Sequence, residues 1–449
     1  ESFLRQHLDE LIWPFLRQAV RVPRDAESIE EAVRRAPEWP PTTILVSPGN
    51  YRERLLLTKP VTLLAEGAGV LLSCAEGAAP LRLSGDCQPP PEVRGLTVRS
   101  SATCVLVECG APVVSRCSIA SDRGHGVLAR GAARPAVLGC ELRGHRKAAV
   151  VFRDQACGAF RGNRLEGNDG HGVLIYGTAS PTVEDNDFVG HRSPAVVVRG
   201  RAEAVLRGNR FRDNRDYGVV VCGSARPLLE GNSLQGQRLP AISVRDEAAG
   251  VVRGNRLRDN GGYGIVACGT GRPLLEDNDL RAHKMPGIAV LDGSSAVVRG
   301  NWLEANEGVG IAVGNSAQPL VEGNTLTGNK RKAGSCPDGL EDRPGAEDDG
   351  YDRSTRRLVQ RAAIAVRDQA GGVVRGNRLE GNDGYGILVC GEARPTVEAN
   401  EVRGHRGAAI AVQDRAEAVL RGNRLQGNGV GLLVEATARP TIEGNQTDA

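Results

Sequence analysis

Apolar residues recur along this chain at fixed distances from one polar residue, an asparagine that returns every 23 positions. Leu, Phe or Val follows it after two residues, apolar pairs such as Val219 and Val221 after ten and twelve, and Val or Leu after twenty. The asparagines are Asn163, Asn186, Asn209, Asn232, Asn255, Asn278, Asn301, Asn324, Asn377, Asn400 and Asn423, with Asn445 one residue early. A fixed period of this length indicates a repeat architecture in which each unit stacks on the next.

Apolar residues within each short run are spaced by two, which is the periodicity of a β-strand. Val173 and Ile175 show this spacing, and Ile387 and Val389 repeat it far along the chain. Gly-Asn, Arg-Pro and Asp-rich corners separate the runs. Three short strands per repeat predict an all-β fold, a parallel β-helix, and parallel crossovers favour the right-handed sense. The asparagines are then expected to stack inside it as a ladder of amides.

The residue two positions before each asparagine alternates in charge from repeat to repeat. The series is Arg161, Glu184, Arg207, Glu230, Arg253, Glu276, Arg299, Glu322, Arg375, Glu398, Arg421 and Glu443. Stacked coils place these side chains over one another, so alternation replaces repulsion with opposite pairs worth about 0.2 to 1 kcal/mol each at a surface. We expect these charges to stabilise the stacking.

Composition supports a repeat protein and argues against other classes. The chain has 449 residues, 58 of them glycine, and only 3% aromatic residues, which suits a narrow continuous core. A net charge of +3, with arginine and glutamate interleaved, does not indicate nucleic-acid binding. No apolar run reaches membrane-spanning length, and the first residues do not resemble a secretory signal.

The 11 cysteines include no C-x-x-C pair. Cys117 and Cys140 occupy the asparagine position of their repeats, whereas Cys222, Cys268 and Cys390 share another position. Cys222 and Cys268 would lie two coils apart, roughly 9.6 Å, which exceeds disulfide reach. Reduced thiols are therefore expected, in a cytoplasmic or nuclear protein with no metal site and no cofactor.

The start of the chain predicts a helical cap over residues 1–37, ahead of a β-helix over 38–449. Residues 2–20 have the apolar pattern of an amphipathic helix broken near a proline, suited to covering the first coil or to binding a partner. A second helix is expected to begin at Ser28, because Ser28 and Glu31 have the spacing of a capping box.

A 30-residue excess interrupts the register at about 330–361. Its glycine, proline and mixed charges predict a surface loop, after which the coils resume in phase. Tyr351, Ser354 and Thr355 are candidate modification sites there. The alternative is a tolerated insertion without function.

The sequence gives little support for catalytic histidines. Gly-His-Gly occurs around His125 and His171, at the position where Gly-Tyr-Gly occurs in other repeats, so it marks a coil corner. A further set of histidines shares a repeat position with Asn168, Asn214 and Asn260, which favours a structural role; it comprises His145, His191, His283 and His405.

Paired carboxylates flank two of the ladder asparagines. Asp185 and Asp187 form one pair, and Asp277 and Asp279 the other. General acid and base chemistry on a sugar polymer needs two carboxylates about 5 to 9.5 Å apart. Arginines of adjacent coils are expected to pair with these acids, so we predict no catalytic residue.

A stripe of rings and prolines is the better candidate for binding. The ring residues are His171, Tyr217, Tyr263 and Tyr385, eight positions after the asparagine, and prolines occupy the same position in intervening repeats. Small residues follow most of them, so we expect the rings to be exposed and suited to recognising a protein. Corner packing between coils is the alternative.

Two quoted stretches carry a family resemblance. GIAVLDGSSAVVRGNWLEANEGVGIAVGNSAQPLVEGNTL and the upstream SIEEAVRRAPEWPPTTILVSPGNYRERLLLTKPVTLLAEG resemble the repeat region of β-helix-containing F-box proteins and SHC-binding protein relatives. Bacterial carbohydrate-active β-helix proteins also look similar. The resemblance covers nearly the whole chain and implies a parallel β-helix; an F-box domain would need more residues upstream than are present here.

Two functional hypotheses follow. The first is a noncatalytic scaffold that holds a protein partner along one face, which the resemblance extends to substrate recognition in a ubiquitin-ligase assembly. The second is a polysaccharide lyase, hydrolase or epimerase acting on a uronate polymer. Self-association through the last coil is a further expectation, because its strand edges would be open to pairing.

Overall fold

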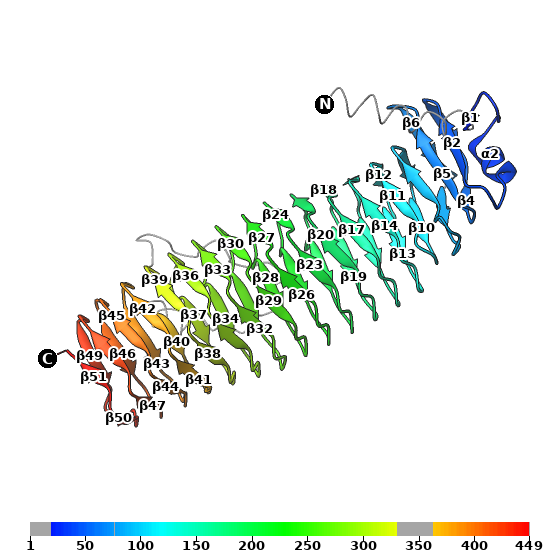
Figure 1. The fold of residues 1–449 in the computed structure, drawn as a ribbon. Helices are drawn as coiled ribbons and strands as arrows, with labels where there is room; N and C mark the ends of the chain where they lie inside the picture. Colours follow the sequence, from blue (N-terminus) through cyan, green and yellow to red (C-terminus); the bar gives the residue numbers. More distant parts are fainter. Residues whose placement is uncertain (1–18, 76, 330–361, 449) are drawn as a thin grey trace, which may run out of the picture. The chain divides into compact units, whose positions relative to one another are not determined.

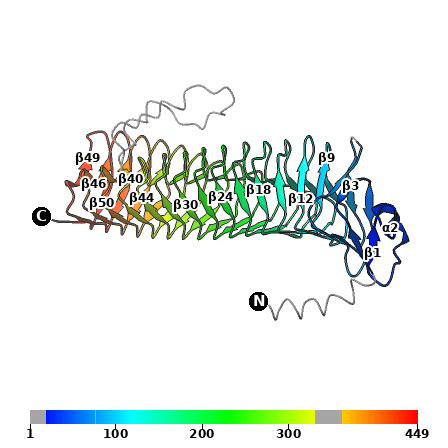
Figure 2. The same cartoon turned by 90° about the horizontal axis from the view of Figure 1, so that it is seen from above.

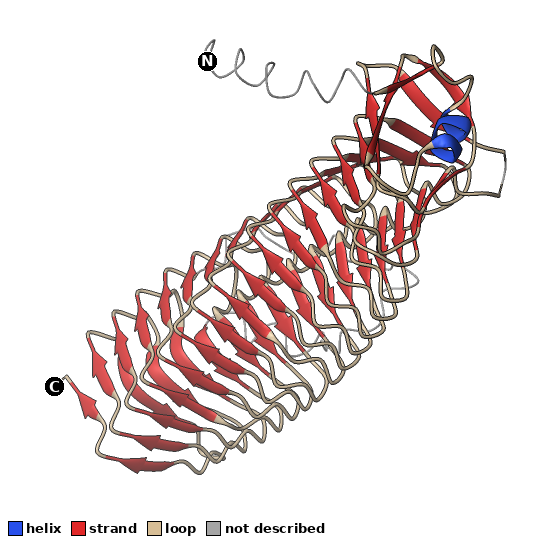
Figure 3. Ribbon diagram, turned by 45° about the vertical axis from the view of Figure 1, so that its right-hand side comes forward, coloured by secondary structure: helices blue, strands red, loops and turns tan. Residues whose placement is uncertain are grey.

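In the computed structural model, residues 19–75, 77–329 and 362–448 are described, and the chain divides into two units, 1–215 and 216–449. Each unit is a right-handed parallel β-helix, as the 23-residue period predicted. Strands and loops make up nearly all of it (Figure 3). Each coil contributes one strand to each of three parallel sheets, here named A, B and C.

The first unit contains one short helix, which follows its first strand, and the early strands of all three sheets (Figure 1). Sheet A holds β1 (Val20–Val22), β2 (Thr42–Val46), β5 (Val61–Ala65), β8 (Glu92–Arg94), β11 (Val113–Ser115), β14 (Ala136–Leu138), β17 (Ala159–Arg161), β20 (Thr182–Glu184) and β23 (Val205–Arg207). Sheet B holds β3 (Gly49–Arg52), β6 (Val70–Ser73), β9 (Thr97–Ser100), β12 (Ser118–Ser121), β15 (Glu141–Arg143), β18 (Arg164–Glu166), β21 (Asp187–Val189) and β24 (Arg210–Arg212). Sheet C holds β4 (Leu55–Leu57), β7 (Leu81–Leu83), β10 (Val105–Val107), β13 (Val127–Ala129), β16 (Val150–Phe152), β19 (Val173–Ile175) and β22 (Val196–Val198).

The second unit repeats the same order. Sheet C holds β25 (Val219–Val221), β28 (Ile242–Val244), β31 (Ile265–Ala267), β34 (Ile288–Val290), β37 (Ile311–Val313), β40 (Ala362–Val366), β43 (Tyr385–Val389), β46 (Ala408–Val412) and β49 (Val430–Val434). Sheet A holds β26 (Leu228–Glu230), β29 (Val251–Arg253), β32 (Leu274–Glu276), β35 (Val297–Arg299), β38 (Leu320–Glu322), β41 (Val373–Arg375), β44 (Thr396–Glu398), β47 (Val419–Arg421) and β50 (Thr441–Glu443). Sheet B holds β27 (Ser233–Gln235), β30 (Arg256–Arg258), β33 (Asp279–Arg281), β36 (Trp302–Glu304), β39 (Thr325–Thr327), β42 (Arg378–Glu380), β45 (Glu401–Arg403), β48 (Arg424–Gln426) and β51 (Gln446–Thr447).

The strands of successive coils pair in exact repeat register. Val173 of β19 lies opposite Val196 of β22, and Ile265 of β31 lies opposite Ile288 of β34. Within each unit the strands of a sheet follow one behind another (Figure 2). Side chains that share a repeat position therefore form continuous rows along each unit.

The helix α2 (Ile29–Arg35) begins where its capping residue predicted. The Glu31 N–H donates to Ser28 Oγ at 3.1 Å, and Glu53 accepts from the Ile29 and Glu30 N–H groups. Its apolar side buries Ile29 against the first strands of the unit. Strand β1, within the stretch predicted as a helical cap, pairs with β2.

The register continues across the insertion. Ile311 of β37 pairs with Ile364 of β40, and the Asn324 N–H donates to Asn377 Oδ1 at 2.9 Å. The prediction that the coils resume in phase is thus confirmed. Residues 2–18 of the expected amphipathic helix, the insertion itself, and Tyr351, Ser354 and Thr355 lie outside the described residues.

One stabilising row was missed in the sequence. In the turn that follows sheet C, an aspartate accepts the N–H of the residue at the same position one coil earlier. Gly131 N–H donates to Asp154 Oδ2 at 3.0 Å in the first unit, and Gly223 N–H to Asp246 Oδ2 at 2.8 Å in the second. Both aspartates have φ of 61°, the left-handed region that Asp tolerates better than most residues. This row joins one coil to the next at the turn.

Candidate functional site

The recurrent asparagines are internal, as predicted. Asn163 donates from both its backbone N–H and its Nδ2 to Asn186 Oδ1, at 2.9 and 3.0 Å, and Asn186 Nδ2 donates to the Phe160 carbonyl at 2.8 Å. The same contacts join Asn255 to Asn278 in the second unit. Each amide is buried and has hydrogen-bond partners in its own and neighbouring coils. These residues stabilise the corner between sheets A and B and do not face a ligand.

The histidines form part of a second internal ladder, which confirms their predicted structural role. The His191 N–H donates to Asn214 Oδ1 at 2.9 Å, and the His283 N–H donates to Asn306 Oδ1 at 3.1 Å. All four histidines of this row are buried. Burial lowers the pKa of His191 to about 4 and that of His283 to about 3, because the charged imidazolium is poorly solvated there. They stay neutral, and a substrate cannot reach them.

Arginines contact three of the four carboxylates in the two acid pairs. Asp185 contacts Arg161 at 3.2 Å, and Asp187 contacts Arg164 at 3.7 Å and Arg212 at 2.5 Å. In the second unit Asp279 contacts both Arg258 and Arg281. Carboxylates engaged by arginines in this way do not present a free acid and base pair to a substrate.

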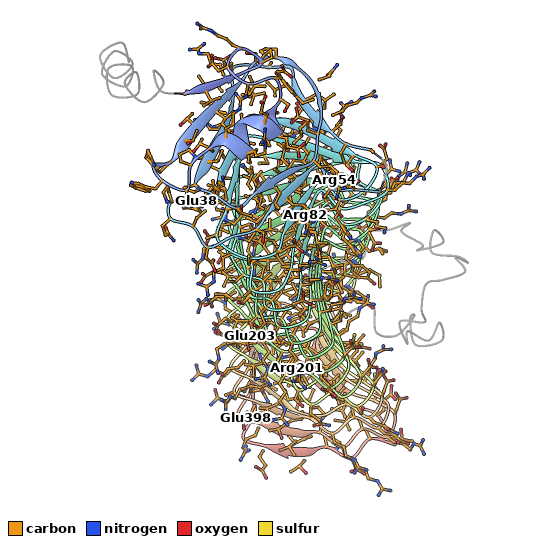
Figure 4. The ribbon with its side chains drawn as sticks, turned by 90° about the vertical axis from the view of Figure 1, so that its right-hand side faces the viewer. Glu38, Arg54, Arg82, Arg201, Glu203 and Glu398 are labelled. Carbon is orange, nitrogen blue, oxygen red and sulfur yellow. The ribbon has the colours of Figure 1, made fainter. Side chains whose placement is uncertain are left out.

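The alternating charges also pair as predicted. Arg207 contacts Glu184 at 3.5 Å, Arg253 contacts both Glu230 and Glu276, and Arg375 contacts Glu322. Charged side chains of this kind project outward from the coils, as Arg201 and Glu203 do in Figure 4. Among the described residues, no three His, Cys, Asp or Glu side chains gather as metal ligands.

The cysteines of the ladder position are buried thiols. The Cys117 N–H donates to Cys140 Sγ at 3.4 Å, and the Cys140 N–H donates to Asn163 Oδ1 at 2.8 Å, so the thiols continue the asparagine ladder. Cys268 and Cys390 are free thiols as well, and burial raises the pKa of Cys390 to about 12. Cys117 and Cys140 are buried, and burial raises the pKa of Cys268 and Cys390, so none of these four is an exposed thiolate nucleophile.

The predicted ring stripe is only partly exposed. His171, Tyr217 and Tyr385 are half-buried, whereas Tyr263 is 4% exposed, so the expected exposure is wrong at Tyr263. Tyr263 packs with Val266 into a cluster of buried residues on the outer side of sheet C, because small neighbours leave room for its ring. His171 Nδ1 lies 3.2 Å from the Pro194 carbonyl, a corner contact of the kind that the alternative described.

Tyr217 keeps a polar partner. The guanidinium of Arg245 lies 4.7 Å from the centre of the Tyr217 ring and donates to its hydroxyl. Tyr176 has the same kind of contact in the first unit, with Arg199 at 5.1 Å. Tyr217, in the ring stripe, and Tyr176, at a different repeat position, are each covered by an arginine on one face, an arrangement worth roughly 0.5 to 1 kcal/mol at a surface.

A different row of the first unit forms the candidate surface. The central residue of each sheet C strand points outward, and from β10 to β22 that residue is always aliphatic. We call this row the sheet C strip; it consists of Leu106, Leu128, Val151, Leu174 and Val197, each paired in register with the next. Leu106, Leu128 and Leu174 are half-buried, and the two valines are buried.

The other two sheets differ from sheet C over the same coils. In sheet A, β17 to β23 each turn a charged side chain outward, as Arg161 and Glu184 do. In sheet B, β18 to β24 do the same, as Arg164 and Asp187 do. Both faces of sheet C are thus apolar, although only the inner face belongs to the core. Sequence reasoning counted the apolar pair at ten and twelve and overlooked the aliphatic residue between them.

Comparisons with known proteins identify the fold. The family model described as the right handed beta helix region matches residues 81–226, 194–339 and 351–447. No curated protein gives a significant match. In the described residues, no helix is long and apolar enough to cross a membrane.

Three solved structures have similar chains. A mutant of the periplasmic alginate epimerase AlgG has 12% identity and a TM-score of 0.43, over 97% of this chain and 89% of its own. The alginate lyase from Paenibacillus sp. str. FPU-7 has 13% identity and a TM-score of 0.40, over 59% of this chain and 95% of its own. The PL6 family polysaccharide lyase Pedsa3628 from Pseudopedobacter saltans has 13% identity and a TM-score of 0.39, over 68% and 93%. At such identities and scores the likeness carries no argument about activity.

Proposed function

We propose that this chain, which belongs to the right-handed β-helix family, is a noncatalytic binding protein that holds a protein partner on the outer face of sheet C. The observation that carries the proposal is the sheet C strip. Single exposed apolar residues are common, but Leu106, Leu128 and Leu174 are half-buried in one row with the buried Val151 and Val197, and an apolar row of this kind on an outer face favours an interaction surface. The hydrogen-bonded ladders at the corners of the coils support the proposal, because a scaffold held in this way needs little ordering when a partner binds.

The contacts of the titratable side chains support a noncatalytic role. Asp185 and Asp187 are ion-paired, and His145, His191, His283 and His405 are buried in a ladder. A glycosidic bond would need one carboxyl free to carry a proton and a second facing it across the substrate. Beside the strip, the Glu108 carboxylate is likewise paired, with Arg82 and Arg130.

A uronate-active enzyme is the alternative, since the names of the neighbouring structures describe alginate epimerase and alginate lyase for those proteins. The aliphatic strip argues against it, because sugar rings are held by aromatic faces and hydrogen-bonding groups. Neither the family match nor the neighbours name an F-box protein or a ubiquitin ligase. We therefore propose protein binding and no role in a ubiquitin-ligase assembly.

The test places a photo-crosslinking amino acid at Leu128 or Leu174, on the strip, and at Val205, an outward residue of sheet A in the same unit. We expect discrete crosslinked protein products from the two strip positions, and their loss when the other strip leucine is changed to aspartate. Equal crosslinking from Val205 would contradict the proposal. So would turnover of polymannuronate that an Asp187→Asn variant loses, which would favour the enzyme.

A further inference from the structure

Basic side chains border the sheet C strip on both sides. On one side Arg130 and Arg153 directly follow β13 and β16, and Arg199 follows β22. On the other side a second basic set lies in the turns that lead into the same strands. It comprises Arg123, Arg146, Lys147 and Arg192, all of them exposed.

Acidic or aromatic side chains contact the cations of the first border. Arg130 pairs with Glu108, and Arg153 lies 3.6 Å from Asp154. Arg199 stacks on Tyr176, which holds its guanidinium in place beside the strip. This border therefore presents fixed cations to a partner.

Most cations of the second border have no acidic partner. Arg192 pairs with Asp169 at 3.1 Å. Arg123, Arg146 and Lys147 form no ion pair with any described residue. The charges of Lys147 and Arg153, after burial itself, help to lower the pKa of His125 at this edge, which shows that both cations act on the same corner. Two acidic residues, Asp122 and Asp169, lie in the same turns as these four cations, so basic side chains outnumber acidic ones on this border.

The leucines of the strip and the basic borders together favour one class of anionic partner over another. Leu106, Leu128 and Leu174 offer aliphatic contact, whose burial is worth roughly 25 cal/mol per Å². A uronate polymer supplies carboxylates but few aliphatic groups to cover these leucines. A polypeptide with acidic and aliphatic side chains supplies both.

Resting on the proposed function, we infer that the partner segment is an acidic amphipathic polypeptide. Its aliphatic side chains lie on the sheet C strip, and its Asp or Glu side chains face the two basic borders. Charge complementarity of this kind raises the association rate and fixes the orientation of the partner more than it adds affinity.

The experiment uses the full chain and two fluorescent synthetic peptides with identical leucine positions, one with glutamate and one with lysine at all flanking positions. Binding is followed by fluorescence anisotropy at low and high salt, with polymannuronate as competitor. We expect the glutamate peptide to bind at least about tenfold more tightly, a difference of about 1.4 kcal/mol, and to weaken as salt rises. Equal binding of the two peptides, or displacement by polymannuronate at matched charge concentration, would overturn the inference.

Matched variants assign the effect to the border. Arg146→Glu/Lys147→Glu is expected to remove most of the preference for the glutamate peptide. Arg94→Glu/Arg99→Glu makes the same change of charge at exposed arginines on sheets A and B of the same unit, and is expected to leave it nearly intact. If the two double variants behave alike, the border is not the recognition element.

A third variant separates this inference from the proposed function. Leu128→Asp/Leu174→Asp is expected to abolish binding of both peptides, with an unchanged circular dichroism spectrum. If it does so while Arg146→Glu/Lys147→Glu changes nothing, the strip binds its partner but the acidic assignment is wrong. If it has no effect on either peptide, both proposals fail.

Discussion

The outer face of sheet C differs between the two units, although the same repeat position supplies it. In the first unit the row is aliphatic, half-buried at its leucines and bordered by arginine. In the second unit it belongs to a cluster of buried residues, including Val266, Ala289, Ala365, Leu388 and Ala411. Cys268 and Leu291 occupy the position that Arg153 and Arg199 occupy in the first unit.

The difference shows which part of the repeat is constrained by the fold. Inside, Asn186 and Asn278 make the same contacts in both units, because each amide has to satisfy buried backbone groups. On the outer face of sheet C, no buried backbone group depends on the side chain. The residues of this row therefore differ between the units with the side chains that they contact.

The largest effect is expected from one substitution made in both units. Leu388→Asp places a charge in the buried cluster and is expected to lower the free energy of unfolding by roughly 3 to 5 kcal/mol. Leu174→Asp, at the half-buried strip, is expected to cost about 1 kcal/mol or less. Urea unfolding followed by circular dichroism measures both. Equal costs would mean that the two faces do not differ in burial.

The internal ladder is expected to respond equally in both units. Asn186→Ala leaves the Asn163 N–H and the Phe160 carbonyl without their partner, and Asn278→Ala does the same to Asn255 and Val252. Each buried unsatisfied group costs about 1 to 3 kcal/mol, so each variant is expected to lose roughly 3 kcal/mol. A difference of more than about 1 kcal/mol between them, in the same urea assay, would contradict a common interior.

Acid is expected to destabilise the protein through the buried histidines. Their pKa is lowered on folding, from about 6.5 in the unfolded chain to about 4 for His145 and His191. Between these values the unfolded chain binds more protons, so the free energy of unfolding falls as the pH falls from about 6.5 toward 4. Each histidine is expected to contribute on the order of 1 to 3 kcal/mol across that range.

His191→Asn and His283→Asn test this in the two units, because asparagine already occupies the same ladder position in other coils. Each is expected to flatten the dependence of unfolding free energy on pH between about 7 and 5. A slope equal to that of the parent protein would show that other groups take up the protons.

The smallest effect is expected on the charged exterior. Arg161→Ala removes the contact with Asp185, in which both side chains are more than half exposed, at 62% and 54%. Exposed pairs of this kind contribute about 0 to 1 kcal/mol. The melting temperature is expected to change little, and a large drop would mean that the outer charges hold the coils together more strongly than the ladder does.

Several features were predictable because they repeat. The spacing of Asn163 and its equivalents gave the period, the pairs such as Val173 and Ile175 gave the strands, and the exchange of His191 with asparagine gave the second ladder. The capping spacing of Ser28 and Glu31 gave the short helix. The helix start is the exception, because it depends on a capping residue next to the helix and not on the repeat.

The surface was less predictable. Tyr263 and Tyr217 share one repeat position, yet one is buried and the other half-buried, because their exposure depends on side chains of other coils. The sheet C strip was hidden for a related reason. Leu174 lies between the core residues Val173 and Ile175, so all three positions of this strand are apolar in the sequence. Only the strand geometry shows that Leu174 points away from the core.

The sequence by itself determined the coil length, the three-sheet β-helix, both internal ladders and the alternating charges, because each is a local pattern repeated until it is unmistakable. Only the tertiary structure decided which apolar row faces outward, which ring is covered, and which cations border the strip. Those properties are set by packing between coils, and the coils meet only after the chain has folded.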